Sequence, residues 1–215
     1  MMTYAQVADF QRRMGNIVRA GKVASVDLAT ARCRVSIGEL LTAPLPFISA
    51  KAGYDSTWHP PEVGEQVIVL APSGELSAGF VLGGVYTTAH PAPSTSAEVS
   101  KMLFKDGTTA TYDRALHSLT LDLPTAGSSL SITVNGNATI HASGNALVEA
   151  VGNATLSAGA VARIEAGTRL DIVAPSVEIT STVTVSGDVV AGGKSLKTHK
   201  HGGVATGGGQ TGMPV

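Results

Sequence analysis

The stretch Gly136-Asn-Ala-Thr-Ile-His-Ala-Ser is followed at once by Gly144-Asn-Ala-Leu-Val-Glu-Ala-Val and Gly152-Asn-Ala-Thr-Leu-Ser-Ala-Gly, so the chain repeats every eight residues. The frame continues less strictly to Pro175. One column of the repeat holds larger apolar residues and another holds alanine: Ile140, Val148, Leu156, Ile164 and Ile172 in the first, and Ala142, Ala150, Ala158, Ala166 and Ala174 in the second. A fixed short period of this kind predicts a stacked or wound repeat architecture.

Each octad reads as a β-strand, because apolar residues fall at every second position and would share one face. The opening Gly-Asn pair predicts a corner, since both residue types tolerate left-handed backbone. A single copy cannot cover its apolar face, because the strip is thin and both strand edges are open. One chain could coil on itself, or three identical chains could wrap about a shared axis. Eight residues is short for a single-chain coil, for which related repeats run about 20–29 residues, and suits one face of a three-sided prism. We therefore expect an intertwined homotrimer, with a triple-stranded β-helix rod over residues 130–193.

Composition narrows the classes of function. The chain has 215 residues and a net charge of −1, which argues against a general nucleic-acid binder and against docking on an anionic bilayer. All aromatic residues lie before residue 113, so the second half lacks the large side chains of an ordinary globular core. The lone Cys33 excludes an intrachain disulfide and is interpreted as a small buried hydrophobe. We expect no secretory signal, because Asp9, Arg12 and Arg13 stand where an apolar segment should lie, and no membrane span.

The N-terminal half predicts a short helix followed by a small β-barrel. Val7, Phe10 and Met14 recur at near-helical spacing over residues 3–15, and this helix is either a docking element for a partner or a cap on the next domain. Short strands are expected at 17–26, 31–37, 67–70 and 80–86, which favours a barrel of the oligonucleotide/oligosaccharide-binding (OB) type. Seven basic and seven acidic residues balance over residues 1–90. Few aromatics there are flanked by basic residues, as stacking platforms would be. A structural barrel without nucleic acid is therefore expected.

Between barrel and rod we expect a linker and β-hairpins. Residues 90–97 have the composition of a linker, and Asp106-Gly107 predicts a tight turn. A further strand over residues 116–123 would place Leu119, Leu121 and Leu123 on its inward face. The expected domains are the helix at 1–16, the barrel at 17–89, the linker and hairpins at 90–129, the rod at 130–193 and a tip at 194–215.

One cluster could carry chemistry, the segment Thr198-His199-Lys200-His201. On an extended strand His199 and His201 would face the same side. One chain then offers an incomplete metal site, but three chains on a threefold axis would offer six imidazole nitrogens. Octahedral geometry disfavours zinc, which prefers four ligands, and admits Fe(II), Co(II) or Ni(II), with the affinity order favouring nickel. The alternative is a solvated basic segment, since Lys194, Lys197 and Lys200 lie close by. The glycine-rich residues 202–215 are either a floppy tail or a segment that folds back to close the tip. Paired carboxylates, a nucleophile elbow, a phosphate loop and a cysteine-based metal site are absent from the sequence, so no enzyme is expected.

The order of these pieces resembles the central spike of contractile-tailed phages, the baseplate assembly protein V family. The resemblance covers nearly the whole chain. Its motifs are Pro61-Glu-Val-Gly64-Glu65-Gln-Val67, Gly79-Phe-Val-Leu-Gly-Gly-Val-Tyr86, Phe104-Lys-Asp-Gly107, the repeat rod, and Thr198-His-Lys-His201 followed by glycines.

The resemblance implies a homotrimer whose apex holds one iron ion through six histidine nitrogens, from His199 and His201 of each chain, and it allows further ions along the axis. It implies attachment to the baseplate hub through the barrel end. It also implies a place in the virion tail baseplate, after assembly in the host cytoplasm, and piercing of the target's outer membrane when the sheath contracts. Phage tails and related bacteriocin or prophage particles share such spikes.

Two other functions would require different features in the sequence. The first is a trimeric receptor-binding fibre or adhesin that recognises a surface glycan, which should carry aromatic sugar platforms at its tip, whereas no aromatic residue follows Tyr112. The second is a cell-wall hydrolase fused to a needle, which would need an inserted domain with catalytic carboxylates.

Overall fold

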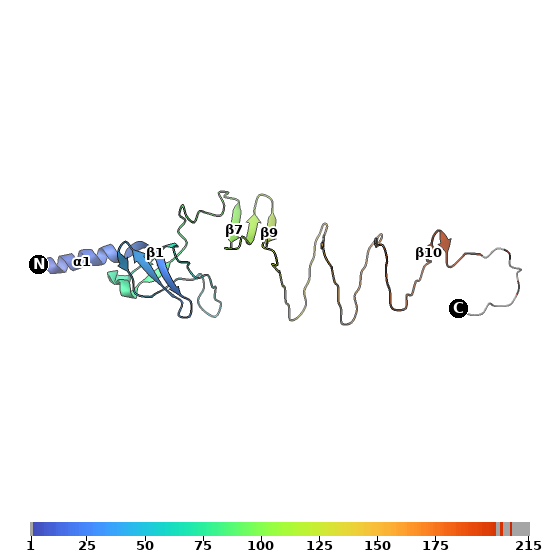
Figure 1. Cartoon of the computed structure of the whole chain (residues 1–215), viewed down its shortest axis with the longest axis horizontal. Helices are drawn as coiled ribbons and strands as arrows, with labels where there is room; N and C mark the ends of the chain where they lie inside the picture. The colour runs from blue at the N-terminus through green and yellow to red at the C-terminus, as the bar shows by residue number, and fades with distance from the viewer. Residues whose placement is uncertain (1, 201–202, 204–206, 208–215) are drawn as a thin grey trace. The chain divides into compact units, whose positions relative to one another are not determined.

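The computed structural model describes residues 2–200, 203 and 207 (Figure 1). The chain divides into two compact units, Met1–Ala138 and Thr139–Val215, and each is described by itself. The described part is mainly β, with one α-helix at the N-terminus.

Helix α1 spans Tyr4–Asn16 and begins with a capping box. The backbone N–H of Gln6 donates to the Thr3 hydroxyl at 3.2 Å, and the Thr3 N–H donates to the Gln6 side-chain carbonyl at 2.8 Å. These two bonds satisfy N–H groups that the first helical turn cannot pair internally. The helix predicted over residues 3–15 is confirmed, and none of its residues is buried.

The barrel is a six-stranded antiparallel sheet that closes on itself. Its strands are β1 (Val18–Asp27), β2 (Arg32–Ile37), β3 (Leu40–Leu41), β4 (Leu45–Pro46), β5 (Gln66–Leu70) and β6 (Phe80–Leu82). They follow the order β3-β2-β1-β5-β6, with β4 also pairing with β2. Closure comes from Phe47, which bridges to Val81, and from the Ile48 N–H, which donates to the Val81 carbonyl at 2.8 Å. Two 3₁₀ turns, η1 (Pro72–Gly74) and η2 (Leu76–Ala78), connect β5 to β6.

The barrel core is built from small β-branched side chains rather than aromatics. Its buried residues are Val23, Cys33, Val35, Ile37, Leu45, Val67, Val69 and Val81. Alternate residues of β2 and β5 point into this core, as the period of two predicts. The interpretation of Cys33 as a buried hydrophobe is confirmed. Burial raises the pKa of its thiol, and the negative charge of Glu65 adds to this effect.

A separate three-stranded antiparallel sheet follows the barrel. It contains β7 (Val99–Leu103), β8 (Thr109–Asp113) and β9 (Ser118–Asp122). The tight turn predicted at Asp106-Gly107 is present, with Gly107 at a φ of 89° and the Thr108 N–H donating to the Asp106 carboxylate at 2.9 Å. Of the leucines expected to face inward, Leu119 and Leu121 are exposed in the single chain and Leu123 is partly buried, so this sheet has no buried core of its own.

The octad region bends at the period that the sequence predicts. Bends fall at 135–136, 143–144, 151–152, 159–160 and 167–168, with extended legs between them (Figure 1). The prediction that each corner is the Gly-Asn pair was wrong by one position, because each bend takes the first residue of an octad and the residue before it. Left-handed backbone was also the wrong reason, since Gly136 has a positive φ but Gly144 and Gly152 do not. The next bends come at Pro175, Ser181 and 186–187, so the legs shorten after Pro175.

The extended legs form neither backbone hydrogen bonds nor a core within their own chain. Across residues 129–188, all of which are described, no backbone–backbone hydrogen bond occurs within the chain and no strand forms. The apolar column is open to solvent, with Ile140 96% and Val148 91% exposed. The unit closes with the hairpin of β10 (Val190–Ala191) and β11 (Lys194–Ser195).

Candidate functional site

The predicted tip begins on the β10–β11 hairpin. Gly192 and Gly193, with φ of 55° and 77°, form its two-residue turn, a geometry that side chains other than glycine disfavour. The Leu196 N–H donates to the Val189 carbonyl at 2.9 Å, and the Lys197 N–H donates to the Asp188 carboxylate at 3.0 Å. The hydrogen bond from the Ser195 hydroxyl, followed by that from Lys197, holds the pKa of Asp188 below its ordinary value. Asp188 therefore remains an ionised acceptor that ties the end of the hairpin to its start.

His199 is oriented by Ser195. The His199 backbone N–H donates to the Ser195 carbonyl oxygen at 3.1 Å, and its ring Nδ1 lies 2.9 Å from the same oxygen. A carbonyl oxygen only accepts hydrogen bonds, so this contact is a hydrogen bond when Nδ1 carries a proton, and in the neutral ring Nε2 then has the lone pair. This is the arrangement by which histidine ligands of metal ions are commonly positioned, with one ring N–H on a backbone carbonyl.

Neighbouring contacts stabilise the same turn. The Thr198 N–H donates to the Ser195 hydroxyl oxygen at 2.9 Å, and the Thr198 hydroxyl donates to that oxygen at 2.8 Å. The second predicted ligand, His201, lies outside the described residues. Within the described part of one chain, no group of three or more histidine, cysteine or acidic side chains could hold a metal ion.

The Arg and acidic side chains of the octads confirm the period-two alternation of the legs. Arg163 pairs with Glu165 at 2.9 Å, and Arg169 pairs with Asp171 at 2.8 Å. Each pair joins residues two apart, which lie on one side of an extended strand. This side is opposite to the one that carries the apolar column.

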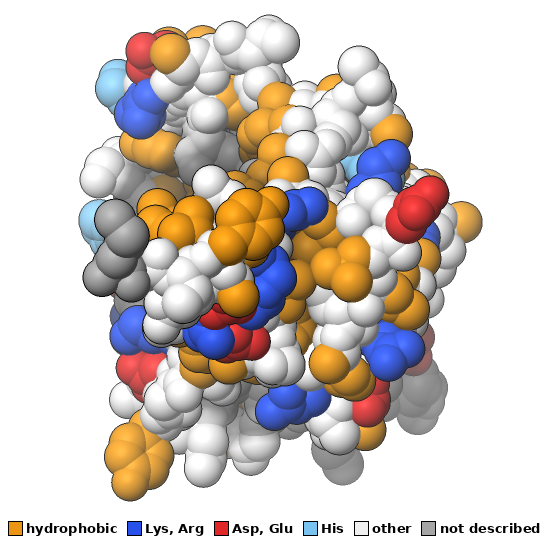
Figure 2. All heavy atoms as spheres, turned by 90° about the vertical axis from the view of Figure 1, so that its left-hand side faces the viewer, with side chains coloured by type: hydrophobic (Ala, Val, Ile, Leu, Met, Phe, Trp, Pro, Cys, Tyr) orange, Lys and Arg blue, Asp and Glu red, His pale blue; other side chains and the backbone are white. Residues whose placement is uncertain are grey.

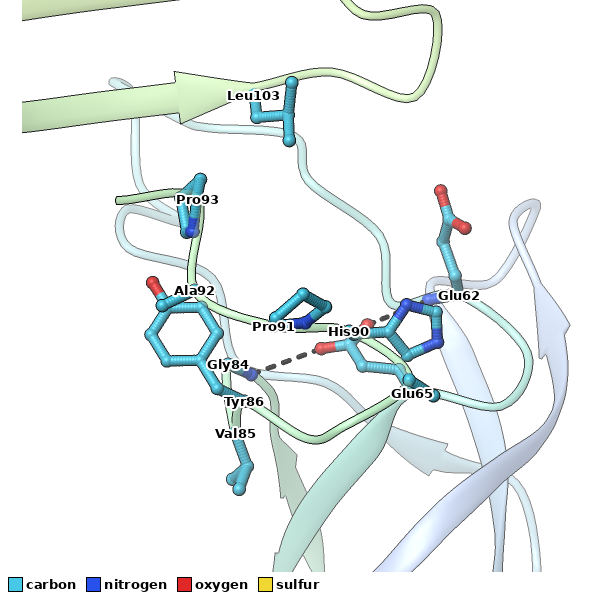
Figure 3. A pocket seen from close by; sticks show the side chains of 11 residues that line it. Glu62, Glu65, Gly84, Val85, Tyr86, His90, Pro91, Ala92, Pro93 and Leu103 are labelled. Carbon is cyan, nitrogen blue, oxygen red and sulfur yellow. Dashed lines mark hydrogen bonds between the residues drawn. The ribbon is translucent and has the colours of Figure 1, made fainter. Parts of the chain in front are cut away.

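A pocket of about 580 Å³ lies between the barrel and the segment that leaves it, and it is lined by Tyr86, Leu103 and the prolines Pro91 and Pro93 (Figure 3). Its two carboxylates are both engaged. The Glu65 carboxylate accepts from the Gly84 N–H at 3.2 Å and from the Glu62 N–H at 2.9 Å, and Glu62 lies 3.8 Å from the Lys105 ammonium group. The Glu65 contacts pin two loops rather than leave a carboxylate poised for proton transfer.

The sequence did not point to Ser195, Asp188 or Glu65, although each positions a predicted feature. Ser and Asp are common capping residues at turns, and this was the one available signal for the first two. Glu65 belongs to the motif over residues 61–67. Its contact with Gly84 joins positions 19 residues apart, so it could be identified only from the folded structure.

None of the helices among the described residues is long and apolar enough to cross a membrane.

Comparison with known proteins gives three matches. Residues 19–86 match the model of the type VI secretion system/phage-baseplate injector OB domain, and residues 195–215 match the GpV apex motif. The spike protein of Escherichia phage P2 is 35% identical over 234 aligned positions, which cover the full length of both chains. The first match coincides with the closed barrel, and the second begins at the serine that orients His199.

Proposed function

The chain belongs to the family of phage spike proteins, and we propose that three copies intertwine through their octads into a needle that pierces the outer membrane of the target cell. As a member of this family it is a tail spike of a contractile injection device and has its place in the virion tail baseplate. The barrel is the family's injector OB domain.

The proposed trimer rests on one observation, which is that residues 139–188 are neither packed together nor joined by backbone hydrogen bonds within a single chain. They expose their apolar column and leave their backbone groups without partners inside the chain. Full burial of an aliphatic side chain is worth about 1.5–3 kcal/mol, and each backbone hydrogen bond adds about 0.5–1.5 kcal/mol net. With bends every eight residues, three octads would make one three-sided turn of a chain, and two further copies would fit between successive turns.

This geometry predicts which residues of different chains are neighbours. With three chains related by a threefold axis, the strand next to one octad on the same face is the following octad of another chain. Residue r then lies beside residue r+8 of a neighbour, about 4.8 Å away. Arg163 would meet Asp171, and His141 would meet Glu149, so opposite or complementary groups face one another. The intrachain pairs Arg163–Glu165 and Arg169–Asp171 would thereby join into a network.

The tip residues fit a shared metal ion. His199 already has its Nδ1–H placed on the Ser195 carbonyl, and His201 follows at the spacing that puts both rings on one side of an extended strand. Six imidazole nitrogens from three chains would bind one iron ion, and such an ion would crosslink three chain ends without adding bulk. Further ions along the axis would need ligands that the described residues do not identify.

The remaining partners follow from the family. The barrel end is proposed to attach to the baseplate hub, the rod end to contact the target membrane, and neither to bind nucleic acid. We also propose that the protein is not an enzyme, which is supported by the structural role of its family and by the engagement of the Glu65 carboxylate in the pocket with two backbone N–H groups.

Sedimentation equilibrium of the purified full chain tests the proposal. We expect a mass three times that of one chain over a wide concentration range, because an entwined assembly cannot separate without unfolding its rod. An ordered, soluble monomer would overturn both the trimer and the shared metal site.

A further inference from the structure

Helix α1 carries an apolar stripe that the barrel does not cover. The stripe consists of Val7, Phe10, Met14 and Ile17, which are 39%, 56%, 55% and 41% exposed. Ile17 caps the helix with helical dihedral angles, φ −56° and ψ −41°, so it continues the same line. Exposed hydrophobic side chains are also visible among charged ones from the side on which the N-terminus lies (Figure 2).

The spacing of the stripe is that of a coiled-coil seam. Its members follow one another at steps of three, four and three residues, the pattern of alternating a and d positions of a heptad. A helix that packs on a globular surface usually presents a wider apolar face, whereas a strict a/d stripe suits a partner helix. The spacing therefore favours helices of the same kind over a flat protein surface.

The flanks of the seam are compatible with identical partners. The flanking e and g positions are Tyr4, Gln6, Gln11 and Arg13, of which only Arg13 is charged. Its guanidinium is held by Asp9 at 2.7 Å and by Glu75 at 3.0 Å. Copies of this helix would therefore approach one another with little like-charge repulsion.

Among the described residues, the polar contacts that anchor the helix to the barrel lie at its C-terminal end. Arg12 and Arg13 reach Glu75 on the turn between η1 and η2. The Ala71 N–H donates to the Ile17 carbonyl at 2.9 Å, and Gly74 packs so closely on the Arg13 backbone that a side chain there would collide with it. Thirteen residues make a helix that is marginal by itself in water. It needs further contacts along the stripe.

We propose that the α1 helices of three copies pack along this stripe into a parallel three-helix bundle at the barrel end of the spike. The inference rests on the proposed trimer, which would tether the three helices at high effective concentration, so that a short seam suffices. The bundle would make the N-terminal end a second site of self-association, independent of the octads.

Cysteine crosslinking of the full chain tests the seam. Phe10→Cys places a thiol in the stripe, and Ala8→Cys places one on the opposite side of the helix as the matched control. Cys33 is buried and does not compete. Under mild oxidation we expect Phe10→Cys to form disulfide-linked pairs of chains at least about tenfold faster than Ala8→Cys, since only seam positions come within disulfide reach.

Hydrogen exchange gives an independent readout. We expect slow exchange of the α1 amides in the native chain and exchange at least about tenfold faster in Phe10→Asp, with the trimer mass unchanged. The bundle would be overturned if a chain that still sediments as a trimer crosslinked equally in the two cysteine variants, or if exchange were unchanged in Phe10→Asp. The stripe would then be a binding surface for a different protein. A monomer in sedimentation would instead reject the proposed function itself.

Discussion

Glu65 shows how one side chain fixes a part of the barrel that strand pairing leaves open. Its two carboxylate oxygens accept hydrogen bonds from the loop before β5 and from the loop after β6. Strand β6 ends at Leu82, earlier than the expected 86, because the chain turns at Gly83-Gly84 toward this carboxylate. Gly83 lies so near to Glu65 that an added side-chain carbon would come within 2.6 Å of a carboxylate oxygen.

We expect Glu65→Ala to destabilise the barrel by about 1–2 kcal/mol, because two backbone N–H groups lose their acceptor and can be satisfied only by water. This corresponds to a fall in the unfolding temperature of about 5–10 °C. Trp58 is the single tryptophan and packs at 5.9 Å from Phe47, so its fluorescence reports on the barrel. Glu39→Ala, which removes the same charge from an exposed turn, is the control, and equal shifts in the two variants would show that only charge matters.

Cys33 should make barrel stability depend on alkaline pH. Its pKa is raised in the folded state by burial, so its contribution to stability is fully present below the unfolded pKa of about 8.5 and is lost as the pH rises toward the folded pKa. We expect a loss of up to about 2 kcal/mol by pH 10, at about 1.4 kcal/mol per pH unit above the unfolded value. Trp58 fluorescence during denaturant unfolding from pH 7 to 10 measures it. Cys33→Ala should have a flatter profile, and parallel profiles would contradict the assignment.

At the scale of elements, the sequence predicted the helix, the tight turn and the bends, which depend on residues close together in the chain. Apolar spacing placed α1 within one residue, and Asp106-Gly107 placed the β7–β8 turn. The octad period predicted the spacing of the bends. The exact corner residues could not be predicted, because a gentle bend makes no demand for left-handed backbone. The shorter legs after Pro175 have no repeating signature, and the closure of the barrel at Phe47 and Val81 joins residues far apart in sequence.

The octad register can be tested with pairs of cysteines. We expect Arg163→Cys/Asp171→Cys to oxidise to a covalent trimer on a non-reducing gel, because residues eight apart would be neighbours in different chains and within disulfide reach. Leu147→Cys/Asp171→Cys, three octads apart, is the control and should remain uncrosslinked, because two strands of other chains would separate its thiols. Intrachain crosslinking of the control pair would instead indicate that one chain coils on itself.

For the whole molecule, the candidate site depends on assembly. One chain contributes His199 and its support from Ser195 and Asp188, and the sequence adds His201. These residues become a complete ligand set only if three chain ends meet, so the repeat that predicts the trimer also predicts the site. The spacing of His199 and His201 in the sequence therefore supports the proposed ligands, while the hairpin beside them required the fold, because Asp188 and Lys197 meet across a turn.

We expect that the proposed ion at the apex can be removed without dissociating the trimer. We expect His199→Ala/His201→Ala to lose the proposed metal, measured by elemental analysis, and to remain trimeric, because the octads would form most of the contact between chains in the proposed trimer. Without the ion the ends of the three chains lose their crosslink, so amides over residues 190–199 should exchange faster, whereas those of the octads should not. Lys200→Ala is the control, since it removes a positive charge between the two ligands and should retain the metal. Equal metal content in the double variant and the native chain would assign the ion elsewhere, and loss of metal in Lys200→Ala as well would show that the substitutions act by disrupting the tip and not by removing two ligands.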